Sequence, residues 1–118
     1  VIYRDGIWDN DRIGSLVVVA EQCEGSIDGI TFENIEIFRD EGRAILVKVY
    51  DEGKENFKIE NVQFRNISYT SYMPSKFDGN GSGTNTVNVD LENVTANGKL
   101  VKRKGLRFEI GKNCAVEI

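Results

Sequence analysis

Three segments of the sequence share one short pattern. They run from residue 27 to 35, from 59 to 67 and from 86 to 94, and the common phrase is I-x-x-I-x-F-x-N-I. The copies begin at unequal intervals. Unequal intervals suit the coils of a solenoid that carries insertions between its strands better than they suit a helical repeat of fixed length. The pattern therefore predicts a stack of similar β-coils.

Within each copy, apolar side chains recur at every second residue, as in Ile30 and Phe32. This period is typical of a strand with one face turned inward. The alternation breaks at an Asn, a residue that tolerates a left-handed backbone and fits a bend. We expect Asn34, Asn66 and Asn93 to mark one corner and to form a ladder of hydrogen-bonded amides.

Second strands are expected between the copies, at residues 16–20 and 44–50, which are rich in β-branched side chains. We expect an all-β fold, a fragment of a right-handed parallel β-helix that forms one unit over residues 1–118, with coils over about 1–96. A β-sandwich is the alternative, although a sandwich does not require like residues to stack in register.

The end of the chain predicts a hairpin and a C-terminal cap over residues 97–118. Asn97-Gly98 suits a tight turn between residues 94–96 and 99–101, and short strands are expected at 106–110 and 115–118. The longest irregular segment is expected at 71–85, which holds Pro74 and a Gly-rich run that should loop outward.

The amino-acid composition excludes several classes of function. The net charge is −4, which disfavours binding to nucleic acid or to an anionic membrane surface. The sequence has no His, so it lacks the usual zinc sites and any Ser-His or Cys-His pair. We expect no cofactor and no metal, and we expect Cys23 and Cys114 to be small hydrophobic residues, although a disulfide between them remains open.

The phrases at residues 27–69, with Ile13 to Glu21 before them and Val89 to Gly98 after them, resemble the late coils of pectin-lyase-like proteins, and more closely of glycoside hydrolase family 28-like proteins. The resemblance implies that these are C-terminal coils of a larger β-helix protein that acts on a polysaccharide. The family's Asn-Thr-Asp, Asp-Asp, Gly-His-Gly and Arg-Ile-Lys motifs are absent from this sequence. No catalytic residue is therefore transferred.

Trp8 and Tyr72 are candidate substrate-binding residues, because aromatic rings can cover the apolar face of a sugar. Asp9 and Arg12 follow Trp8 and could bond hydroxyl groups. The alternative is that Trp8 closes the upstream end of the core. Asp9 and Asp11 could also form the carboxylate pair of an inverting glycosidase, but a solvated acidic loop explains them better.

The favoured function is the C-terminal part of a secreted or cell-surface glycoside hydrolase, with an oligosaccharide or polysaccharide as partner and with no catalytic residue in this segment. A non-catalytic carbohydrate-binding module and a purely structural solenoid are the alternatives. We also expect the edge formed by residues 1–20 to pair with upstream coils of the same protein or to self-associate.

Overall fold

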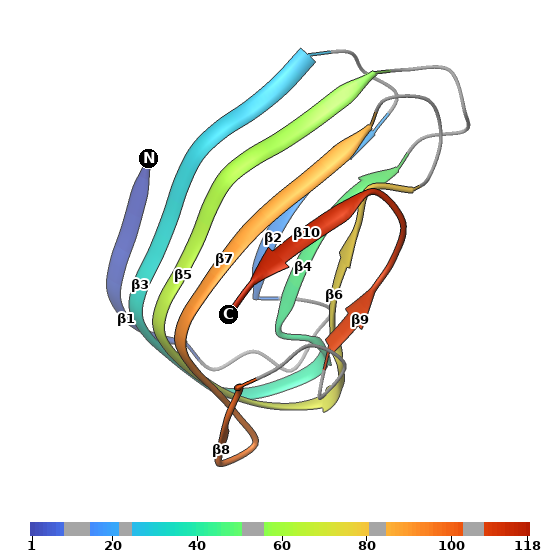
Figure 1. Ribbon diagram of the computed structural model, residues 1–118. Helices are drawn as coiled ribbons and strands as arrows, with labels where there is room; N and C mark the ends of the chain where they lie inside the picture. The colour runs from blue at the N-terminus through green and yellow to red at the C-terminus, as the bar shows by residue number, and fades with distance from the viewer. Residues whose placement is uncertain (9–14, 22–24, 51–55, 81–84, 103–107) are drawn as a thin grey trace.

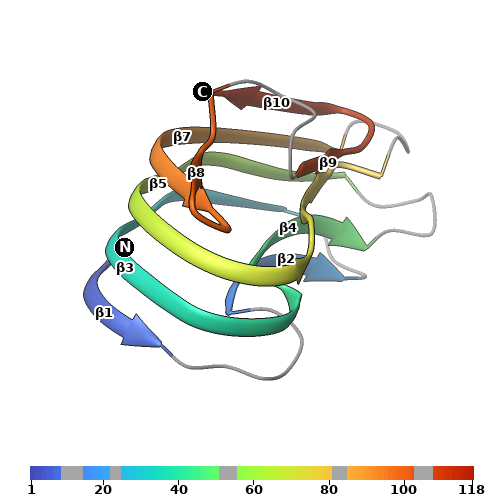
Figure 2. The ribbon, with the colours of Figure 1, turned by 90° about the horizontal axis from the view of Figure 1, so that it is seen from below.

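The computed structural model is an all-β solenoid of about three turns, built from parallel coils (Figures 1 and 2). It describes residues 1–8, 15–21, 25–50, 56–80, 85–102 and 108–118. The described strands are β1 (Ile2–Trp8), β2 (Leu16–Glu21), β3 (Gly25–Arg43), β4 (Ile45–Tyr50), β5 (Phe57–Met73), β6 (Ser75–Asp78), β7 (Thr86–Ala96), β8 (Lys99–Leu100), β9 (Phe108–Ile110) and β10 (Cys114–Glu117). The described residues include no helix that is long and apolar enough to cross a membrane.

The strands form two sheets that face each other across the core. Sheet A has the order β1-β3-β5-β7-β10, and sheet B has the order β2-β4-β6-β9. Every pairing along these two orders is parallel, as a β-helix requires. The predicted parallel β-helix is confirmed, and the β-sandwich alternative is wrong. Figure 2 shows the coils stacked from β1, which we call the upstream end, to β10, the downstream end.

The core consists of side chains that stack in columns from coil to coil. Phe32 pairs in register with Phe64, and their rings stack with centroids 5.2 Å apart. Beyond the aligned strands, Phe77 meets the Phe64 ring edge-on at 6.4 Å, so the aromatic column joins sheet A to sheet B. Each such aromatic pair contributes about 0.5–1.5 kcal/mol beyond the burial of its area. Because apolar residues have the same spacing in successive coils, their side chains stack into a continuous core.

The predicted asparagine corner is confirmed. Asn34, Asn66 and Asn93 adopt φ angles of 57°, 52° and 52°, in the left-handed region that Asn tolerates. The Asn66 amide donates to Asn34 Oδ1 at 2.9 Å, and the Asn93 amide donates to Asn66 Oδ1 at 2.7 Å. Asp5 extends this ladder, because it has φ 61° and accepts a hydrogen bond from the Asn34 amide at 3.0 Å.

A second corner precedes the first in β3 and β5 but is missing from β7. Gly29 and Asn61 form it, with φ angles of 88° and 54°. In β7, Val87 pairs with Ile59 and Val89 pairs with Val62, so the strand has one residue fewer across this position. The alignment of Thr86 with Ile59 that the repeat suggested is therefore wrong, since Thr86 pairs with Lys58.

The expected irregular segment is also wrong over residues 71–78. Ser71 to Met73 belongs to β5, and Ser75–Asp78 forms β6 of sheet B. Ser75 and Phe77 are fully buried, so this short segment keeps the inward alternation of a strand although Pro74 interrupts it. Asn85 is also fully buried, and its Oδ1 accepts a hydrogen bond from the Phe57 amide at 2.6 Å.

The C-terminal strands continue both sheets. The Asn97-Gly98 hairpin is confirmed, with antiparallel pairing of β7 and β8 and φ angles of 49° and 81° at the turn. β9 pairs with β6, and β10 pairs with β7, both in parallel. Cys114 pairs with Val87 and packs against the core, but it is half-buried and not buried as expected, while Cys23 lies outside the described residues.

Candidate functional site

The four predicted substrate-binding residues do not form one described site. Asp9 and Arg12 lie outside the described residues. Trp8 ends β1, where its backbone pairs with Ile37, and Ile37 in turn pairs with Tyr69. Trp8 and Tyr69 are thus two strand spacings apart, about 10 Å, and Tyr72 lies three residues further along β5. Tyr72 is the predicted residue whose surroundings the structure defines.

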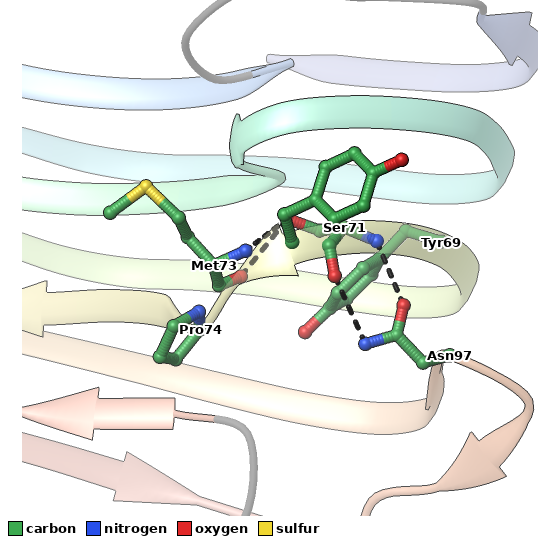
Figure 3. A pocket seen from close by; sticks show the side chains of 6 residues that line it. Tyr69, Ser71, Met73, Pro74 and Asn97 are labelled. Atoms are coloured by element: carbon green, nitrogen blue, oxygen red, sulfur yellow. Dashed lines mark hydrogen bonds between the residues drawn. The ribbon is translucent and has the colours of Figure 1, made fainter.

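Tyr72 borders a cavity of about 240 Å³ at the end of β5. Tyr72 is 86% exposed, although Tyr is generally of intermediate burial in folded proteins. The lining residues are Tyr69, Ser71, Tyr72, Met73, Pro74 and Asn97, which come from β5, the β5–β6 connection and the hairpin turn (Figure 3). A rigid strand therefore holds an exposed ring beside a small hollow.

The Asn97 amide closes the hairpin side of this cavity. Asn97 Oδ1 accepts a hydrogen bond from the Ser71 backbone N–H at 2.8 Å, and Asn97 Nδ2 donates to the Ser71 carbonyl at 3.1 Å (Figure 3). The side-chain amide thus imitates a peptide group of a neighbouring strand. The backbone N–H of Asn97 also donates a hydrogen bond to the Tyr69 carbonyl at 2.8 Å. The side chain and the backbone of Asn97 therefore both hold β5 in place.

Hydroxyl groups in and beside the cavity also form hydrogen bonds within the chain. Ser71 Oγ lies within hydrogen-bonding distance of the carbonyls of Gly42 and Met73. Ser75 Oγ donates to the Tyr69 hydroxyl at 3.0 Å, and both residues are buried. A nucleophilic hydroxyl needs an adjacent base, and neither hydroxyl has one among these contacts. These hydrogen bonds fix the positions of the Ser71, Ser75 and Tyr69 side chains.

A second cavity, of about 390 Å³, shares Met73 with the first. It lies over the outer face of sheet B and the end of β3, and its lining is Gly42, Arg43, Leu46, Lys48, Tyr50, Met73 and Lys76. The Lys48 ammonium lies 4.5 Å from the centroid of the Tyr50 ring, a cation–π contact. This cavity therefore combines an exposed aromatic ring with cationic side chains.

Arg43 connects the end of β3 to the β5–β6 connection and to β9. One guanidinium nitrogen donates to the Pro74 carbonyl at 2.8 Å, and the other lies 3.1 Å from Glu109 Oε2. Lys76 Nζ reaches the same carboxylate oxygen at 3.9 Å. Two cations share one carboxylate, so the described side chains at this rim include more cations than anions.

Sequence patterns could have identified part of the second cavity. Lys48 and Tyr50 alternate with buried Val47 and Val49, which assigns them to one outward face. Arg43, Lys76 and Glu109 are brought together only by the stacking of coils, and no spacing in the sequence indicates that contact. Within the described ranges, no cluster of three or more His, Cys, Asp or Glu side chains could hold a metal ion.

Three comparisons with known proteins found no match for this chain among family models, curated proteins or solved structures.

Proposed function

We propose that this chain is a solenoid segment that contacts an oligosaccharide or polysaccharide through the surface on both sides of Met73. The observation that supports this proposal best is the position of Tyr72, which is 86% exposed at the edge of a cavity. An exposed ring on a rigid strand offers an apolar face to a sugar and loses little conformational entropy on binding. Tyr50, which is 41% exposed, offers a second ring across Met73.

The proposed role is binding and scaffolding within a carbohydrate-active β-helix protein. The resemblance to family 28-like late coils supports this assignment, and it also supports a secreted or cell-surface location and further coils upstream. In the Tyr72 cavity, the Ser71 hydroxyl bonds to the Gly42 carbonyl, and the Tyr69 hydroxyl accepts a hydrogen bond from Ser75. No Asp or Glu is among the described residues that line this cavity, so any hydrolysis by the whole protein needs carboxylates elsewhere.

The test is a glycan-array screen of the chain, of Tyr72→Ala and of Trp8→Ala, followed by titration of the best glycan. Phe38→Ala is the matched control, because Phe38 is an exposed aromatic residue that lines neither cavity. We expect Tyr72→Ala to weaken binding at least about tenfold, which corresponds to about 1.4 kcal/mol. Phe38→Ala should bind normally. The proposal would be contradicted if the unmodified chain bound no glycan. It would also be contradicted if Tyr72→Ala and Phe38→Ala weakened glycan binding equally.

A purely structural segment is the second candidate, and the Asn97–Ser71 pairing favours it. Polar atoms that could bond sugar hydroxyls are used there to hold β5. This candidate predicts that Asn97→Ala lowers the free energy of unfolding by about 1–3 kcal/mol and that no variant changes glycan binding. The glycan proposal predicts instead that Tyr72→Ala changes binding with no change in unfolding.

A further inference from the structure

The turn between β7 and β8 joins Asn97 to Gly98, two residues that can react with each other. The Gly nitrogen can attack the side-chain carbon Cγ of the Asn, because Gly has no Cβ to hinder the approach. A C–N bond forms, and the amide nitrogen leaves as ammonia with the proton of the Gly nitrogen. Water then opens the cyclic imide to Asp or isoaspartate. Gly98 is exposed, so water reaches this turn.

The folded chain holds the Asn97 side-chain amide against the backbone of β5. Oδ1 accepts a hydrogen bond from the Ser71 N–H at 2.8 Å, and Nδ2 donates to the Ser71 carbonyl at 3.1 Å (Figure 3). This pairing depends on a planar amide, whereas the attacked Cγ becomes tetrahedral as the imide ring closes. Both hydrogen bonds must therefore break before Asn97 can react.

The surroundings of the turn are fixed as well. The Asn97 N–H donates to the Tyr69 carbonyl at 2.8 Å, and Lys99 pairs with Ala96 on the other side of the turn. Asn97 is half-buried, and Ser71 is buried. A reaction that requires this corner to open proceeds only in the small fraction of molecules in which it is open.

Conversion of Asn97 to Asp replaces a donor with an acceptor. One carboxylate oxygen can still accept from the Ser71 N–H, but the other faces the carbonyl oxygen to which Nδ2 donated. The described residues that line the Tyr72 cavity include no Lys or Arg to neutralise the new charge. Isoaspartate adds a carbon to the main chain of the turn. Either product therefore removes a contact that holds the end of β5.

We propose that Asn97 is a deamidation site, that its pairing with Ser71 protects it in the folded chain, and that the deamidated product releases the end of β5 from the hairpin. A chain that deamidates while this corner is open cannot re-form both hydrogen bonds, so the change persists after the corner closes. The proposal is independent of glycan binding, because no sugar takes part in it.

The first experiment measures the deamidation rate of the unmodified chain in mildly alkaline buffer, with and without urea. Peptide mapping by mass spectrometry locates the change from amide to acid at Asn97 and at Asn80, which precedes Gly81 in the second Asn-Gly pair of the chain. In urea we expect the two sites to react at similar rates, because the local sequence then sets the rate. In the folded chain we expect Asn97 to react at least about tenfold more slowly than in urea.

The second experiment introduces the product directly. Asn97→Asp should lower the urea concentration at which the chain unfolds and should speed amide hydrogen exchange over residues 69–73. Asn113→Asp is the matched control, because Asn113 also has a left-handed backbone, with φ 52°, and is exposed. The control adds the same charge, yet it should leave exchange over residues 69–73 unchanged and lower the urea midpoint less.

Two results would overturn the proposal. The first is deamidation of Asn97 at the same rate in the folded chain and in urea, because the pairing with Ser71 would then give no protection. The second is an Asn97→Asp variant that unfolds at the same urea concentration as Asn113→Asp, because the product would then keep β5 in place. The rate comparison uses only the unmodified chain, so it tests the protection even if Asn97→Asp does not fold. Glycan binding enters neither readout, so the two proposals can fail separately.

Discussion

Sheet A and sheet B are wound from the same coils, yet their registers are specified differently. In sheet A like residues pair, with Phe32 beside Phe64 and Ile35 beside Ile67. In sheet B, Val18 lies beside Val47, but along the next coil the paired residues differ in size or polarity, with Val47 beside Phe77 and Leu46 beside Lys76. Ring stacking and amide ladders specify the register of sheet A, whereas sheet B relies on the alternation of buried and outward side chains. Repetition in the sequence thus reveals only one wall of the solenoid.

The largest expected effect tests whether the two walls share one core. Phe64 of sheet A and Phe77 of sheet B are both fully buried, and their rings meet edge-on. Phe64→Ala and Phe77→Ala should each lower the free energy of unfolding by about 3–5 kcal/mol, as a large cavity does. Urea unfolding measures this loss. A cost below about 1 kcal/mol for Phe77→Ala alone would show that sheet B is packed loosely.

The next effect concerns the close stacking of β6 on the C-terminal coil. A Cβ added at Gly79 would lie 2.6 Å from the Asn113 carbonyl oxygen and 2.9 Å from that of Lys112. Both contacts are with backbone, so a side-chain rotation cannot relieve them. Gly79→Ala should cost about 1–3 kcal/mol in thermal or urea unfolding. Unchanged stability would show that the C-terminal coil can move away from β6.

The sequence could predict the features that depend on residues near one another in the chain. The alternation and the Asn corners predicted β3, β5 and most of β7, because these need only local preferences and a repeat. The strand β6 was missed, since Pro74 and the following Gly-rich run hid the alternation of Ser75 and Phe77. The Gly79 contact was also hidden, because it depends on a coil about thirty residues away.

The candidate site was predictable to a smaller degree. Tyr72 was identified from its residue type, and the structure adds its exposure and its cavity. The pairing of Asn97 with Ser71 was missed, because a hairpin turn fully explains the Asn97-Gly98 sequence. A hairpin turn gives the Asn97 side chain no role. Contacts between coils depend on register, which a local pattern does not specify.

The asparagine ladder gives a smaller effect that separates conformation from hydrogen bonding. Asn66 has φ 52°, donates to Asn34 and accepts from Asn93. Asn66→Ala loses both hydrogen bonds and strains the backbone, so it should cost about 1–3 kcal/mol. Asn66→Gly keeps the left-handed backbone and should recover about half of that loss in urea unfolding. Equal losses in the two variants would assign the whole effect to hydrogen bonding.

The smallest effect is expected at the second corner, where the coils differ from each other. Gly29 has φ 88° and an added Cβ would have no atom within 4 Å, while the register-equivalent Asn61 has φ 54°. Gly29→Asn should therefore change the free energy of unfolding by less than about 0.5 kcal/mol, because Asn tolerates this backbone. Gly29→Val is the control, and it should cost more than about 1 kcal/mol because a β-branched residue does not tolerate it. If Gly29→Asn lowers the free energy of unfolding as much as Gly29→Val in urea, positions 29 and 61 are not equivalent. The register of sheet A would then depend on the Asn34 corner alone.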